Sequence, residues 1–102
     1  MKINHLHDWN LAPKEAIALQ KSLASQIITD EKINLSKIKT LAGVDVSVKN
    51  GMSQAAVVVM SFPDLEPIET VRAQQATSYP YIPGLLTFRE GPVLEKAFLK
   101  LE

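Results

Sequence analysis

Two carboxylates in this sequence stand where the surrounding residues are apolar. Asp45 lies inside the run "LAGVDVSV", and burying a carboxylate beside valines is costly unless it is paired or binds a cation. Glu90 closes the apolar run "GLLTFRE" and directly precedes Gly91 and Pro92. Two carboxylates from different elements, held close together, would form an oxygen site suited to Mg²⁺ or Mn²⁺. Such a metal can activate water and stabilise phosphoryl charge during phosphodiester hydrolysis.

Each carboxylate also has a purely structural interpretation. Asp45 can lie on the solvent face of an alternating strand, together with Ser47 two residues further on. Glu90 can be a carboxylate at a helix N-terminus, where the helix dipole favours negative charge. The residues themselves leave both interpretations open.

A tyrosine between prolines is the third candidate for function. Tyr81 lies in the loop segment "QATSYPYIPG", and the prolines limit the freedom of that loop. We expect the ring to project outward, as a wedge or stacking platform for nucleic-acid bases. The alternative is that the ring packs on the surface of the domain.

The sequence predicts a helix, three strands and a loop before Glu90. An apolar stripe at helical spacing predicts a helix over residues 12–28, with Pro13 in its first turn and Asn10 available as its cap. Trp9, just before this helix, is expected to pack back on it. A charged connector over residues 29–39 leads to the strands.

Strands are predicted over residues 40–48, 54–62 and 66–74. The first two form a hairpin, because "KNG" at residues 49–51 contains an Asn-Gly pair that tolerates positive φ. After the loop, "LLTF" at residues 85–88 is expected to be a short apolar strand.

The last predicted element is an amphipathic helix over residues 91–102, with Pro92 in its first turn. No strand follows it to cover the open edge of the first strand, and a long exposed edge is prone to pairing. We therefore expect a truncated larger fold, or a chain that completes itself through a homo-oligomer or a complementing second half.

The amino-acid composition limits the classes of protein and the kinds of site that are possible. The 102 residues make one domain, and 46% hydrophobic with 22% charged residues is typical of globular proteins. Lys+Arg and Asp+Glu number 11 each, so no overall basic charge points to nucleic acid. The absence of cysteine excludes disulfides and thiolate metal sites, and His5 and His7 lack further ligands for zinc. With no apolar run of membrane-spanning length, we expect a cytoplasmic protein without a membrane partner.

Three segments together resemble the endonuclease V family, the deoxyinosine 3′ endonucleases: "LAGVDVS", "AAVVVMSFPDLEPIE" and "PYIPGLLTFREGPVL". The opening "WNLAPKEAIALQKSLA" is similar to the family's first helix, so the resemblance covers roughly residues 9–101. It implies part of a ribonuclease H-like fold: an α/β (α+β) domain over residues 1–102 with a three-stranded antiparallel sheet between N-terminal and C-terminal helices. It also implies Mg²⁺-dependent (or Mn²⁺-dependent) hydrolysis of a phosphodiester 3′ to a deaminated base in DNA, or to inosine in RNA.

The resemblance assigns roles to individual residues. Asp45 and Glu90 match the family's first two metal-binding, catalytic carboxylates. The wedge that separates strands next to the lesion matches Pro80, Tyr81, Ile82 and Pro83. The region lining the pocket for the flipped base matches Gly84, Leu85 and Leu86, and Arg89 is expected to hold the site or a phosphate.

The sequence also departs from the family pattern. The third metal-site aspartate, in a "DG-G-x-x-HPR"-like segment, has no counterpart, nor do the later catalytic lysine and histidine. Val48 stands where the family usually has tyrosine. Two functions are therefore expected to compete: an N-terminal half of an endonuclease, incomplete alone, and a non-catalytic module that binds nucleic acid or protein.

Overall fold

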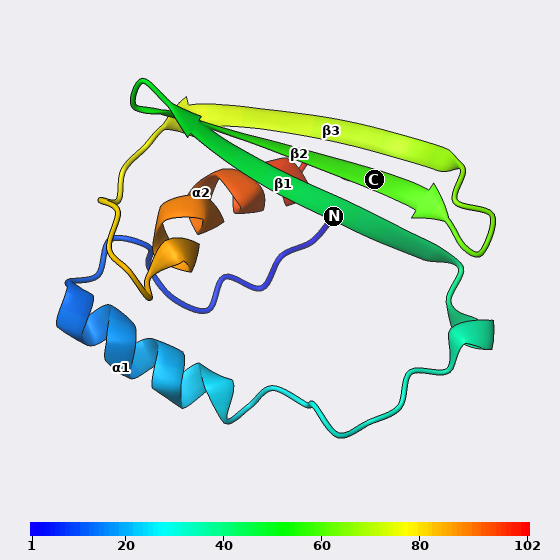
Figure 1. Cartoon of the computed structure of the whole chain (residues 1–102), viewed down its shortest axis with the longest axis horizontal. Coiled ribbons are helices and arrows are strands. Elements are labelled where there is room, and N and C mark those ends of the chain that lie inside the picture. Colours follow the sequence, from blue (N-terminus) through cyan, green and yellow to red (C-terminus); the bar gives the residue numbers. More distant parts are fainter.

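The computed structural model describes all of residues 1–102. In chain order, three strands come between two α-helices, and one short 3₁₀-helix precedes the sheet (Figure 1). In chain order the elements are α1 (Pro13–Ala24), η1 (Leu35–Lys37), β1 (Thr40–Lys49), β2 (Met52–Ser61), β3 (Pro67–Ala76) and α2 (Leu86–Phe98). Neither α-helix has the length and apolar composition needed to cross a membrane.

The three strands form one antiparallel sheet in the order β1-β2-β3, which confirms the predicted fold class. Asn50 and Gly51 have φ values of 53° and 74° and connect the paired residues Lys49 and Met52. Positive φ at both central residues matches the right-handed twist of a hairpin and explains the Asn-Gly pair. The predicted hairpin is confirmed, although β2 begins two residues before the expected Gln54.

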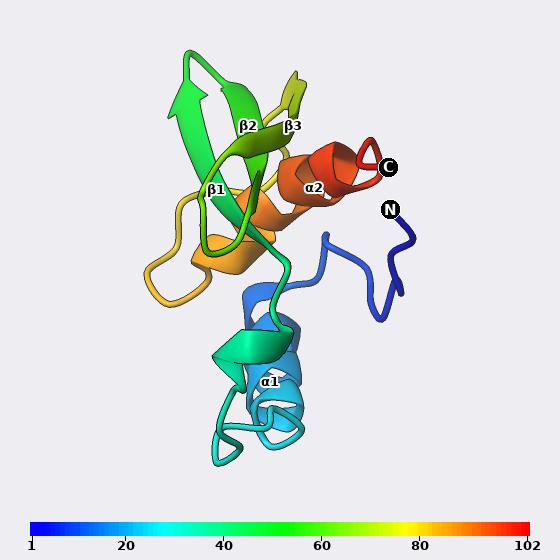
Figure 2. The same ribbon diagram turned by 90° about the vertical axis from the view of Figure 1, so that its right-hand side faces the viewer.

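Helix α2 covers one face of the sheet (Figure 2). The core between them consists of small and β-branched residues from β2 and β3 against the apolar stripe of the helix and the residues that follow it. Its buried members are Ala55, Val57, Ala73, Val93, Ala97 and Leu101. Small side chains on the sheet let the helix approach closely.

The predicted strand over residues 85–88 is wrong, because α2 begins at Leu86. Short apolar runs do not distinguish a strand from a buried helical turn. The expected helix start at Gly91 and Pro92 is also wrong, since both residues lie inside α2. The residue before a proline normally avoids helical geometry because its Cβ clashes with the proline ring. Gly91 has no Cβ, which removes part of this clash where the helix continues through Pro92.

Helix α1 is shorter than the predicted span of residues 12–28, since it ends at Ala24. Its N-cap position is Ala12 and no side chain caps it, so Asn10 does not have the expected role. The residues of α1 have packing partners that the residues after it lack: Ala16 is fully buried and Leu19 packs against the same cluster, whereas Ile27 and Ile28, beyond the helix, are exposed. Because packing rather than propensity stabilises most short helices, the helix ends where its partner ends.

The N-terminal segment, residues 1–12, runs along α2 and closes a second core cluster. The Trp9 ring packs edge-on against Phe88, with 5.8 Å between centroids, and lies directly over Gly91. Trp9 also packs against the cluster that contains Ala16 of α1, which confirms its predicted packing role. Tyr79 is buried in the same cluster, and its hydroxyl donates to the Leu11 carbonyl at 2.8 Å.

Replacing Gly91 with alanine is expected to destabilise the fold. A Cβ at this position would lie 2.4 Å from the Trp9 ring, which is far inside van der Waals contact. Overpacking of this kind typically costs about 1–3 kcal/mol, although alanine is otherwise the better helix former. Chemical denaturation measures the loss. Gly43→Ala is the matched control, because a Cβ there meets nothing within 4 Å; equal stabilities for the two variants would contradict the packing argument.

Candidate functional site

Asp45 lies on the face of the sheet opposite α2. Side chains alternate along β1, and Val46 packs against the core on the α2 side. Asp45 is therefore directed to the other face, where its side chain is exposed. Asp45 thus lies on the solvent face of the strand, as in its structural interpretation. Ser47 lies on the same face, as expected.

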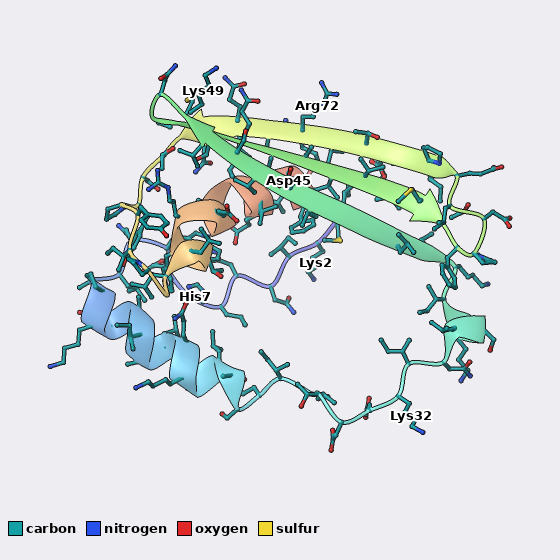
Figure 3. The ribbon with its side chains drawn as sticks, in the orientation of Figure 1. Lys2, His7, Lys32, Asp45, Lys49 and Arg72 are labelled. Carbon is teal, nitrogen blue, oxygen red and sulfur yellow. The ribbon has the colours of Figure 1, made fainter.

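The strand register places a cation on the same row as this carboxylate. Asp45 pairs with Ala56, and Ala56 pairs with Arg72 on β3. Because residues directly opposite in a ladder share a face, the row carries a carboxylate, a small side chain and a guanidinium. Figure 3 shows Asp45 and Arg72 on the two outer strands.

A hollow of about 590 Å³ includes this row. Its polar lining comes from all three strands and from the second residue after α2, namely Asp45, Ser47, Gln54, Arg72, Gln74 and Lys100. Sequence reasoning did not single out Arg72 or Lys100. The Asn-Gly turn could have placed Ala56 opposite Asp45, but a register shift between Val59 and Met60 disguises the β2–β3 pairing.

The side chain of Asp45 makes one hydrogen bond. Its Oδ1 accepts from the backbone N–H of Val46 at 3.0 Å, and no cation lies within salt-bridge distance of it. The carboxylate thus has acceptor positions left over. Such an exposed, incompletely satisfied carboxylate can accept a further donor or a cation.

Glu90 is the fifth residue of α2 and is half-buried. The sequence predicts Glu90 at the end of a strand, just before a helix start. That prediction is wrong, because Glu90 lies within α2. The first turn of α2 carries no acidic residue, so the interpretation as a helix N-terminal carboxylate does not apply. The side chain of Glu90 makes no hydrogen bond or ion pair in this structure.

The two carboxylates do not form a closed metal site in this chain. No interaction joins Asp45 to Glu90, and no group of three or more His, Asp or Glu side chains could hold a metal ion. Divalent cations such as Mg²⁺ take about six oxygen ligands, several of them water. The chain can offer two carboxylate ligands, and the remainder would have to come from elsewhere.

Tyr81 is presented to solvent by an anchored loop. Its side chain is 69% exposed, whereas Tyr79, two residues earlier, is buried and Ile82 packs against the same core cluster. Gly84 has φ of +87°, which a side chain would strain, and its carbonyl accepts from the Gln20 side chain at 3.0 Å. The surroundings of Tyr81 therefore hold the loop while its ring stays exposed.

Arg89 lies close to this ring. Its guanidinium carbon is 5.9 Å from the centroid of Tyr81, within the range of a cation–π contact. The two leucines predicted to line the pocket differ in exposure: Leu85 is 1% exposed and belongs to the core, whereas Leu86 is 53% exposed. The segment thus exposes the aromatic ring of Tyr81 and the apolar side chain of Leu86, with the half-buried Arg89 beside the ring.

Residues 21–102 match the family model of Endonuclease V. Endonuclease V from Dehalococcoides mccartyi is 47% identical over 104 residues, a match that includes the whole of this chain and 46% of that protein. The chain thus spans about half the length of the curated relatives it matches.

Solved structures agree with the sequence matches. Endonuclease V from Bacillus subtilis superposes with a TM-score of 0.87 at 29% identity, covering 100% of this chain and 45% of that one. Ciona intestinalis Endonuclease V, solved with a 24mer DNA containing an inosine followed by a ribo-adenosine, gives 0.74 at 28% identity over 84% of this chain and 38% of that chain. On the family match, the sequence identity and the shared fold, the chain belongs to the Endonuclease V family and corresponds to its N-terminal half.

Proposed function

We propose that this chain is the nucleic-acid-engaging half of an endonuclease that cleaves strands 3′ to a deaminated base, deoxyinosine in DNA or inosine in RNA. The observation that carries the proposal is the loop around Tyr81, which holds an exposed aromatic ring between anchored neighbours. Exposed rings on rigid supports stack on bases or separate them. The relative from Ciona that was solved with inosine-containing DNA supports this substrate class.

The loop contributes several of the expected contacts. Pro80 and Pro83 restrict the backbone on either side of Tyr81 and Ile82, so that little freedom is lost when a strand binds. Gly84 allows close approach of a base to the backbone, since no Cβ intervenes. Leu86 offers an apolar contact. The guanidinium of Arg89, beside the ring, is suited to a phosphate oxygen.

Asp45 and Glu90 are proposed as the ligands that this chain contributes to a divalent cation, Mg²⁺ or Mn²⁺. Carboxylate oxygens are the donors these ions take, and both side chains have free acceptor positions. When bound, such an ion supplies activation of water and stabilisation of phosphoryl charge. The role of these residues in this chain is to hold and orient it, and a complete site requires ligands from outside the 102 residues.

A non-catalytic function is the second candidate. It is favoured by the lack of any cluster of three metal-ligating side chains and by a net charge of zero. On this view the Tyr81 loop binds nucleic acid and nothing is cleaved. Binding that is unchanged in EDTA and in Glu90→Ala, with no cleavage even when a complementing half is present, would favour it over the endonuclease.

Loss of the Tyr81 ring is expected to weaken binding of single-stranded oligonucleotides. Stacking of a base on an aromatic side chain contributes about 1–3 kcal/mol, so Tyr81→Ala should raise the Kd roughly 5- to 150-fold. Fluorescence anisotropy at low salt, with inosine-containing and guanine-containing oligonucleotides, measures the change. Tyr81→Phe is the matched control and should bind like the parent chain. Equal affinities for the alanine variant and the parent would reject the stacking role.

Cation binding by the chain alone is expected to be weak and to depend on Asp45. With two carboxylates at most, Mn²⁺ should bind with a Kd on the order of 1 mM or weaker. Isothermal titration calorimetry should show further weakening in Asp45→Asn. Asp64→Asn, which changes an exposed carboxylate in the β2–β3 turn, should leave the Mn²⁺ affinity unaltered. Micromolar binding, or equal losses in the two variants, would contradict the assignment.

A further inference from the structure

Three cationic side chains gather along the outer edge of β3. Arg72 belongs to the strand, whereas Lys96 lies in the last turn of α2 and Lys100 follows that helix. The Lys96 ammonium donates to the carbonyl of Gln74 at 2.9 Å, and the Lys100 ammonium donates to the carbonyl of Arg72 itself. Positions two residues apart on a strand are separated by about 7 Å, so these contacts bring three positive charges together. We call Arg72, Lys96 and Lys100 the cationic edge.

No carboxylate lies within salt-bridge distance of these cations. Both ion pairs of this structure belong to His5, which pairs with Asp8 and Glu95. Two carboxylates close to the cationic edge in sequence are engaged elsewhere: Glu95 faces His5 at 3.1 Å, and Glu69 accepts from the backbone N–H of Glu102 at 3.1 Å. The cationic edge is therefore a local concentration of unpaired positive charge, although the net charge of the whole chain is zero.

Each of the three side chains has hydrogen-bond donors that are not used. A lysine ammonium has three N–H donors, and a strand carbonyl takes one donor from each of Lys96 and Lys100. The guanidinium of Arg72 makes no hydrogen bond or ion pair, and all three residues are exposed. The strand already holds the two ammonium groups in place, so binding of an anion costs them little conformational freedom.

Protection of the strand edge accounts for only part of this arrangement. Lysines on an edge strand discourage pairing with another chain, and Lys96 and Lys100 also satisfy the outward carbonyls of β3. That role needs no guanidinium. Arg72 instead directs its side chain to the open face of the sheet, in the row of Asp45. Lys100 lines the same hollow of about 590 Å³, so the cationic edge and Asp45 border one surface.

A nucleic-acid strand is the anion that this surface fits. Arg72 and Asp45 lie on the two outer strands, and since neighbouring strands are about 4.8 Å apart, roughly 10 Å separates their backbones. Between them the hollow is lined by uncharged polar side chains, those of Ser47, Gln54 and Gln74. A single small anion would occupy only part of this surface. A backbone of repeated phosphates can contact the cationic edge and still extend over the hollow to Asp45.

We propose that the cationic edge binds phosphates of a nucleic-acid strand, and that Arg72 directs this strand over the hollow towards Asp45. Contacts to phosphates carry no sequence information, because every nucleotide presents the same group. The cationic edge thus contributes affinity and position, whereas selection of a deaminated base belongs to the Tyr81 loop. The identity of the anion rests on the proposed function, but the contacts of the cationic edge do not involve Tyr81.

The salt dependence of binding tests the phosphate contacts. The probe is a single-stranded oligonucleotide that lacks all its bases, so it presents phosphates but nothing that stacks on Tyr81. Each phosphate contact to a single strand adds about 0.7 to the slope of log Kd against log salt concentration, so Arg72→Gln should lower the slope by about 0.7. Arg72→Lys keeps the charge and should keep the slope. Fluorescence anisotropy over a salt series measures it. Equal slopes for the parent chain and Arg72→Gln, or no binding of the probe at low salt, would overturn the proposal.

Lys32→Gln is the matched control. It also removes one exposed cation, but from the connector between α1 and η1, which lies on the other side of the molecule from Arg72 (Figure 3). Its slope should equal that of the parent chain. An equal loss of slope in Lys32→Gln and Arg72→Gln would show a general effect of net charge and would overturn the proposal. Circular dichroism establishes that both variants stay folded.

Nuclear magnetic resonance of the parent chain tests the same contacts without a substitution. Titration with the base-free oligonucleotide should shift the side-chain Nε–H signal of Arg72 and the amide signal of Gln74, while the amide signal of Lys32 stays in place. No shift at Arg72 would overturn the proposal. Competition by poly-glutamate that is as effective as the oligonucleotide would identify an acidic polypeptide as the occupant, and would overturn it too.

Failure of this proposal and failure of the proposed function give different results. If the slope is the same in Arg72→Gln while binding of base-containing oligonucleotides still depends on Tyr81, the cationic edge is rejected and the proposed function remains. If the slope falls in Arg72→Gln while Tyr81→Ala binds base-containing oligonucleotides like the parent chain, the cationic edge is supported and the stacking role is rejected.

Discussion

The alternation of an antiparallel ladder is the constraint on which most of this structure depends. Once the Asn-Gly turn sets Lys49 opposite Met52, every residue of β1 has one face and one edge. Val46 then belongs to the core face, so Asp45 must belong to the open face. The same alternation turns the N–H of Val46 away from β2, where the neighbouring carboxylate satisfies it. One turn thus decides the surroundings of the candidate metal ligand.

The second core cluster depends on close contact between Trp9 and helix α2. Gly91 leaves room for the Trp9 ring, and the N-terminal segment can therefore lie along α2. This contact joins α1, the Tyr79 loop and the start of α2 in one cluster with Phe88. The exposed Tyr81 owes its position to this cluster, since its neighbours on both sides are held there.

The parts of the candidate site are therefore supported separately. The sheet and its register hold Asp45 and Arg72, whereas the aromatic cluster holds Tyr81. Helix α2, which carries Glu90, packs in both core clusters through Phe88 and Val93. Two open surfaces follow from this division: the polar hollow over the sheet and the free edge of β1.

Local sequence determined those features whose physics is local. The Asn-Gly pair at residues 50 and 51 indicated a hairpin, the β-branched runs on either side of it indicated strands, and the prolines around Tyr81 indicated a loop. The motifs were also specific enough to indicate the family. Each of these follows from the properties of a few adjacent residues, so no knowledge of the rest of the chain was needed.

Other features were decided only by tertiary structure. Leu86 to Glu90 form a helix rather than a strand because Phe88 and Leu85 find partners in Trp9, Tyr79 and Ala16, which are distant in sequence. Helix α1 stops at Ala24 because its later residues lack such partners. Arg72 joins the row of Asp45 through a register that a bulge obscures. These outcomes depend on contacts between segments, and packing energy, rather than local preference, selected among conformations that the sequence alone left equally available.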